Sequence, residues 1–196
     1  MSSSADKKHI RKTTDGALDP GTVVNGTYQN RALGLTCKIP EGWVLRTDEM
    51  NEREDDEAHP LAESGMRTAR TGAGKVLLAA FSRPPAAHGE DVNSSILIAA
   101  ESASAYPGLK EPVQYLGVLE EVPKSQGFTV DAGPDEIAIG AKTLVREDFH
   151  KDVGSRVMRQ AILAMLARGY AISITVIGGT EDEVEELLDG LTFSVK

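Results

Sequence analysis

The chain contains 196 residues with a mass of 20.9 kDa, a size that fits one domain rather than two. Its 30 acidic and 21 basic residues give a formal net charge of -9, which disfavours non-specific binding to nucleic acid or to an anionic membrane. No stretch approaches the roughly 20 apolar residues of a membrane-spanning helix, so we expect no membrane insertion. The one cysteine, Cys37, excludes an internal disulfide and a zinc site with two thiolates.

Residues 1–26 are polar and show neither a helical nor a strand period, which predicts a flexible tail in front of a single domain at residues 27–196. The chain begins without the apolar segment of a secretory signal peptide. We therefore expect a cytoplasmic protein, or an exported one if a native leader has been removed.

The first regular pattern is an alternation in which Leu33, Leu35, Cys37 and Ile39 are separated by less apolar residues. A period of two predicts a strand with one buried face, and it makes Cys37 a small buried hydrophobic residue rather than a reactive thiolate. The residues at 40–42, Pro-Glu-Gly, then predict a turn.

Two short apolar runs at 76–81 and 96–100 predict buried central strands, because turn-forming residues flank both of them. Pro112 is suited to the first position of a helix, and Pro123 limits the length of that helix. Three further short apolar segments follow at residues 128–130, 137–139 and 144–149.

The composition of residues 156–168 favours a helix, and only tertiary contacts would make this segment a strand. Residues 170–177 alternate as a strand. A final helix is predicted by the capping pair Thr180 and Glu183, followed by a stripe of apolar residues through Leu191. Several strands joined by short turns, with helices packed on them, indicate an α+β fold with an antiparallel sheet.

An acidic run near residue 55 is the one candidate binding site that the sequence offers, and a nearby histidine strengthens it. We name as candidate ligand-binding residues Glu54, Asp55, Asp56, Glu57 and His59. The run lacks the regular spacing with which loops wrap oxygen atoms around calcium, so a solvated, mutually repelling loop is the alternative interpretation. We predict no metal site and no cofactor.

The sequence shows no complete set of catalytic residues. The glycines at 72–74 precede Lys75, but the other positions of a phosphate-binding loop do not match. Asp148, His150 and Asp152 alternate as the solvated face of a strand would, and a metal site there is the less favoured interpretation. Glu101 and Glu147 adjoin apolar segments as buried acid-base residues would, but nothing in the sequence brings them together.

Three segments resemble, in their order along the chain, the PsbP-like superfamily, which includes the extrinsic P subunit of photosystem II and the Mog-type Ran-binding proteins. They are YQNRALGLTCKIPEGW at 28–43, RGYAISIT at 168–175 and TEDEVEELLDGLTFS at 180–194. The resemblance implies an antiparallel β-sheet sandwiched between helices, an α/β/α architecture. It also implies a strand rather than a helix at 156–168, and a binding domain rather than an enzyme.

The leading functional hypothesis is therefore a non-enzymatic protein-binding or scaffold domain, with its partner and its oligomeric state left open. One alternative is a protein that binds a small ligand or a divalent metal ion through the acidic run. Another is a chaperone for hydrophobic segments of a secreted partner, which requires an exposed apolar groove.

Overall fold

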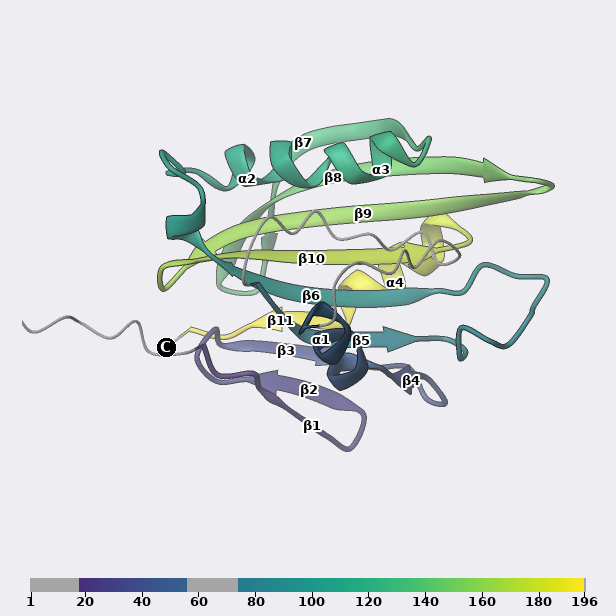
Figure 1. The fold of residues 1–196 in the computed structure, drawn as a ribbon, viewed down its shortest axis with the longest axis horizontal. Helices are drawn as coiled ribbons and strands as arrows, with labels where there is room; N and C mark the ends of the chain where they lie inside the picture. Colours follow the sequence, from purple (N-terminus) through teal and green to yellow (C-terminus); the bar gives the residue numbers. More distant parts are fainter. Residues whose placement is uncertain (1–17, 56–73, 196) are drawn as a thin grey trace, which may run out of the picture.

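The computed structural model of the protein describes residues 18–55 and 74–195. Within these ranges the chain forms two antiparallel sheets (Figure 1). The smaller sheet has the strand order β1-β2-β3-β11, and the last strand of the chain thus completes a sheet that its first strands begin. These strands are β1 (Thr22–Val24), β2 (Thr27–Asn30), β3 (Leu35–Lys38) and β11 (Leu191–Phe193).

The larger sheet has the strand order β4-β5-β6-β10-β9-β8-β7, and every neighbouring pair is antiparallel. Its strands are β4 (Val44–Leu45), β5 (Lys75–Phe81), β6 (Ser95–Ser102), β7 (Thr129–Ile139), β8 (Lys142–Val153), β9 (Arg156–Ala167) and β10 (Tyr170–Gly178). The central strands β5, β6 and β10 are almost wholly buried, as their apolar composition predicts.

The helices are short and lie against the larger sheet (Figure 1). They are α1 (Thr47–Asp55), α2 (Pro112–Leu119), α3 (Glu121–Ser125) and α4 (Glu181–Asp189), with a 3-10 turn at Ala103–Ala105. Helix α1 packs on β5, and α2 packs on β8 and β9. Helix α4 packs on β10 and β9. None of the described helices has the length and apolar composition that a membrane span requires.

The main core fills the space between the two sheets and the buried face of α4. The smaller sheet contributes Tyr28 and Cys37, the larger sheet contributes Ile98 and Ile174, and α4 contributes Leu187 among others. A second core lies on the opposite face of the larger sheet, under α2. Both faces of this sheet are therefore covered. For that reason the sequences of its central strands are continuous apolar runs.

The predicted architecture, a single antiparallel sheet sandwiched between helices, is wrong. The protein is mostly β, with two sheets and few helical residues. The physical reason lies at the two ends of the domain, where short strands pair with one another instead of joining the larger sheet. Thr22 to Val24 belong to this second sheet, although they lie in the range predicted as a tail.

Several element predictions are confirmed. Residues 76–81 and 96–100 lie in β5 and β6, and α2 begins at Pro112. The ambiguous segment 156–168 forms β9, the strand that the family resemblance implies and its composition does not. Residues 128–130 and 137–139, predicted as separate segments, instead largely form the single irregular strand β7, whose pairing with β8 shifts register between Val130 and Asp135.

Candidate functional site

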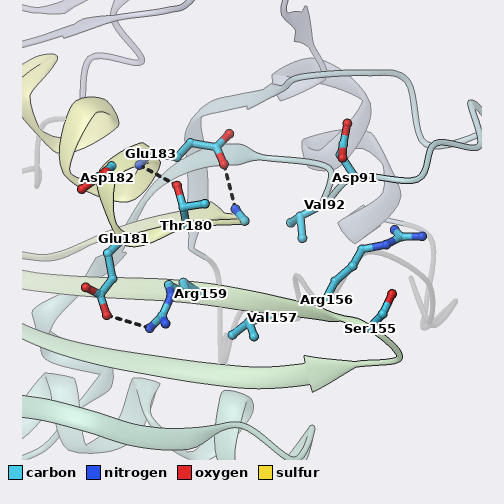
Figure 2. A pocket seen from close by; sticks show the side chains of 11 residues that line it. Asp91, Val92, Ser155, Arg156, Val157, Arg159, Thr180, Glu181, Asp182 and Glu183 are labelled. Carbon is cyan, nitrogen blue, oxygen red and sulfur yellow. Dashed lines mark hydrogen bonds and ion pairs between the residues drawn. The ribbon is translucent and has the colours of Figure 1, made fainter.

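Two adjoining hollows flank the first turn of α4, and together we call them the α4 groove. The larger, of about 770 Å³, lies between the β8–β9 turn, the end of the β5–β6 loop and the start of α4 (Figure 2). The smaller, of about 320 Å³, lies between α4 and strands β7, β8 and β9. Arg159, Glu181 and Asp182 line both hollows, so the two share a wall at these residues.

The start of α4 is held in place by side chains of its own first turn. The Thr180 hydroxyl accepts a hydrogen bond of 3.1 Å from the Glu183 amide, which satisfies one of the unpaired donors at a helix start. The Glu183 carboxylate accepts a 2.8 Å hydrogen bond from the Gly179 amide and a second bond from the Ser94 hydroxyl. The sequence predicts a capping box, and the structure forms its Thr180 half. The Glu183 side chain bonds Gly179 and Ser94 instead of the Thr180 amide, and so ties α4 to the start of β6.

An ion pair separates the two hollows. Arg159 of β9 lies 3.0 Å from the Glu181 carboxylate of α4 (Figure 2). It also lies 3.6 Å from the Asp131 carboxylate of β7. Asp131 also hydrogen-bonds His150 of β8. One arginine thereby connects the helix to the edge of the larger sheet, and it places charge at the middle of the groove.

Arg146 of β8 forms the second connection between the sheet and α4. Its guanidinium donates hydrogen bonds of 2.9 and 3.0 Å to the Asp148 carboxylate and further bonds to Glu185. Burial alone would lower the pKa of Arg146, but the bonds to Glu185 and Asp148 outweigh it and raise that pKa. Burial raises the pKa of Asp148, and Arg146 opposes this effect. Arg146 therefore stays charged and holds two carboxylates at the groove wall.

The groove combines apolar and charged surface, and its acidic side chains outnumber its basic ones. Asp91, Arg156 and Asp182 also line the larger hollow, where they add charge of both signs (Figure 2). An open groove of this kind suits electrostatic recognition of an extended, charged segment. Among residues 18–55 and 74–195, no three side chains of the metal-binding types come together.

The acidic run that the sequence offers as a binding site is not part of the α4 groove. Glu54 and Asp55 are the last residues of α1, which packs on β5. Asp56, Glu57 and His59 lie outside the described residues. The binding role predicted for this run stays a prediction.

Glu101 and Glu147 are both buried, but they do not form an acid-base pair. They lie on β6 and β8, and strands β10 and β9 run between them. Glu101 accepts hydrogen bonds from the hydroxyls of Tyr106 and Tyr115, the latter at 2.9 Å, so it joins α2 to the sheet. Burial, followed by the neighbouring Glu101, raises the pKa of Tyr115 above its ordinary value.

Two of the three alternating polar residues of β8 have structural partners. Asp148 is bonded to Arg146, and His150 is bonded to Asp131 of the neighbouring strand. These contacts explain the polar face of the strand without a metal ion. Sequence reasoning missed Arg146, Arg159 and Glu181 because only strand pairing and helix packing bring them together.

Comparisons with known proteins do not identify a family for this chain. No protein-family model matches the chain, and no curated protein sequence is significantly similar to it. Among solved structures, LpqN of Mycobacterium tuberculosis, described as involved in cell envelope biogenesis, has a TM-score of 0.41 at 12% identity, over 89% of this chain and 85% of that one. PA94 of Pseudomonas aeruginosa, described as of unknown function and a putative regulator, has a TM-score of 0.39 at 15% identity, over 57% and 80% of the two chains.

A protein of Bacteroides thetaiotaomicron has a TM-score of 0.37 at 9% identity, over 83% of this chain and 46% of that one. Scores at this level carry no argument about function. The resemblance to the PsbP-like superfamily stays a prediction, because none of these descriptions names that superfamily.

Proposed function

We propose that the protein is a non-enzymatic binding domain that holds an extended segment of a partner protein in the α4 groove. The observation that carries this proposal is that two hollows, of about 770 and 320 Å³, adjoin each other beside one helix. Two adjoining hollows at the surface suit a chain segment better than a compact substrate, which proteins usually enclose.

The charges of the groove support a protein partner. Arg146 and Arg159 are each paired with two carboxylates, so the charges of the groove wall are arranged by contacts within the protein itself. Complementary charges at a binding surface favour specificity and rapid association. Because acidic side chains outnumber arginines here, the segment that fits best carries an excess of lysine or arginine.

The chaperone hypothesis requires a continuous apolar groove. The exposed large apolar side chains among the described residues are instead spread over separate elements, including Val24 on β1, Leu45 on β4, Val113 on α2 and Val130 on β7. Isolated apolar residues of this kind are ordinary on a protein surface. The observed arrangement therefore favours a polar contact over capture of hydrophobic segments.

Site-specific photo-crosslinking tests the proposal. A photoreactive amino acid replaces Asp182, which lines both hollows, in the full-length chain expressed in its native cell. The matched control carries the same amino acid at Asp189, an exposed acidic residue at the other end of α4. We expect one defined protein adduct from position 182 and none of the same mass from position 189.

Two results would overturn the proposal. One is the absence of a protein adduct at position 182. The other is the same set of adducts at both positions, because random collision with abundant proteins does not distinguish two acidic sites on one helix.

A further inference from the structure

The α4 groove carries more negative charge than its own arginines neutralise. Seven acidic residues and three arginines line the two hollows, which leaves an excess of four negative charges. Two of the acids, Asp91 and Asp182, are exposed, and among residues 18–55 and 74–195 their carboxylates have no ion-pair or hydrogen-bond partner. The groove is therefore complementary in charge to a cationic segment.

The chain itself contains a segment of the opposite charge. Residues 7–12 have the sequence KKHIRK, with four basic side chains and no acidic one. No other run of six residues in the chain holds four lysines and arginines. The four positive charges of this basic segment equal in number the excess of acids in the α4 groove.

The described chain starts close to this segment, at a point that is fixed on the smaller sheet. Leu18 packs against the main core. The Asn30 side chain donates a 2.7 Å hydrogen bond to the Asp19 carbonyl, and the Tyr28 hydroxyl donates one of 2.9 Å to the Pro20 carbonyl. Since the main core also contains the buried face of α4, this anchor and α4 lie on the same face of the larger sheet.

The basic segment is long enough to reach the groove from this anchor. A path from Asp19 crosses β2, β3 and β11 to Phe193 and returns along the chain through α4 to Glu181. From the spacing of strands and the rise of strands and helices, this path is about 40 Å long, and the direct distance is shorter. An extended chain covers about 3.3 Å per residue, so Lys7 reaches up to about 40 Å from Asp19 and Lys12 about 23 Å.

We propose that residues 7–12 bind in the α4 groove of the same chain, where their four basic side chains neutralise its excess of acids, and that an external partner must displace them. The inference rests on the proposed function in taking the groove as the site of an extended basic segment.

The covalent connection makes a weak contact sufficient. A segment tethered this closely is present at the groove at an effective concentration on the order of millimolar. The apparent affinity of an external partner is lowered in proportion to the fraction of molecules whose groove is already filled. The basic segment would thereby act as a competitor that selects for partners with a stronger contact.

Paramagnetic NMR of the full-length chain tests this contact. A nitroxide attached through Ser4→Cys broadens the amide signals of residues near it, and the native Cys37 is fully buried, which protects it from labelling. We expect the amides of residues 155–159 and 180–182 in the groove to lose intensity. The amides of α2, on the opposite face of the larger sheet, are expected to keep theirs.

Charge variants of the basic segment provide the matched controls. Lys7→Glu combined with Lys8→Glu reverses two charges and is expected to restore the groove signals. Lys7→Arg combined with Lys8→Arg keeps both charges and is expected to keep the loss of intensity. No loss at the groove overturns the inference, and so does an equal loss in α2 or a loss that persists in the double glutamate variant.

A mixed sample separates binding within one chain from binding between two. Isotope-labelled protein without the nitroxide is combined with spin-labelled protein that carries no isotope. We expect no broadening in this sample, and a loss equal to that of the doubly labelled chain overturns binding within one chain.

The photo-crosslinking experiment at position 182 distinguishes this inference from the proposed function. Broadened groove signals without an adduct to another protein support the intramolecular contact and contradict the external partner. Such an adduct without broadening supports the external partner and overturns the intramolecular contact.

Discussion

The guanidinium of Arg159 lies 3.0 Å from the carboxylate of Glu181, and this ion pair forms the boundary between the two hollows of the α4 groove. Arg159 comes from β9 and Glu181 from the first turn of α4, so the pair joins the sheet to the helix across the proposed binding surface. Because Glu181 is largely exposed, at 76% of its side-chain surface, the pair contributes little to stability and remains accessible to a partner.

Arg146 is expected to matter more for stability than Arg159. Its side chain is 18% exposed and holds Asp148 and Glu185 by several hydrogen bonds, so Arg146→Met leaves two carboxylates without their cation. We expect the free energy of unfolding at pH 7 to fall by about 1–3 kcal/mol, as measured by urea denaturation. The control Arg156→Met alters an exposed arginine of the larger hollow and is expected to change stability by less than about 0.5 kcal/mol. Equal effects of the two substitutions would contradict the structural role of Arg146.

The β7–β8 turn packs directly on the smaller sheet, at a position where only glycine fits. Gly140 has φ +57°, and an added Cβ would lie 2.3 Å from the Phe193 carbonyl oxygen, which also accepts a 2.8 Å hydrogen bond from Ala141. Gly154, in the β8–β9 turn, has φ +65° with no atom within 4 Å of such a Cβ. The two glycines differ mainly in their surroundings.

Gly154→Ala is therefore expected to cost only the strain of a positive φ, about 1–2 kcal/mol. Gly140→Ala is expected to cost at least about 1 kcal/mol more, because the turn must also move away from β11. Urea denaturation of both variants measures the difference. If Gly140→Ala proves as stable as Gly154→Ala, the contact between the turn and β11 does not contribute to stability.

Cys37 is expected to be unreactive in the folded protein. Its side chain is fully buried, and burial raises the pKa of the thiol from 9.0 to about 12. Thiolate is the reactive form, so labelling with Ellman's reagent at pH 8 is expected to be at least about a hundredfold slower for native than for urea-unfolded protein. Labelling of the native protein at a rate close to that of the unfolded chain would show that the smaller sheet opens readily.

Local patterns in the sequence predicted the elements that local forces determine. The capping pair Thr180 and Glu183 marks the start of α4 in both sequence and structure, and the apolar runs at 76–81 and 96–100 are β5 and β6. The segment 156–168 shows that composition alone does not predict secondary structure. Its pairing with β8 and β10 outweighs its helical propensity.

The architecture and the α4 groove depend on pairings between distant parts of the chain. β11 joins β3 across more than 150 residues, with Leu191 opposite Cys37, and no local signal in either segment predicts that choice. Arg146 of β8 and Glu185 meet only because α4 packs on the neighbouring strands β9 and β10. The acidic run at 54–57 predicts a binding site because its charges are adjacent in sequence, whereas the charges of the groove are adjacent only in space.

The affinity of the crosslinked partner for charge variants of α4 tests the proposed function most directly. Glu181→Lys reverses a charge at the middle of the groove, and Glu186→Lys makes the same change at an exposed position of α4 that lines neither hollow. Binding through the groove predicts that Kd, measured by isothermal titration calorimetry, rises at least about tenfold for Glu181→Lys and changes little for Glu186→Lys. An equal effect of the two variants, or no effect of Glu181→Lys, would place the partner elsewhere on the protein.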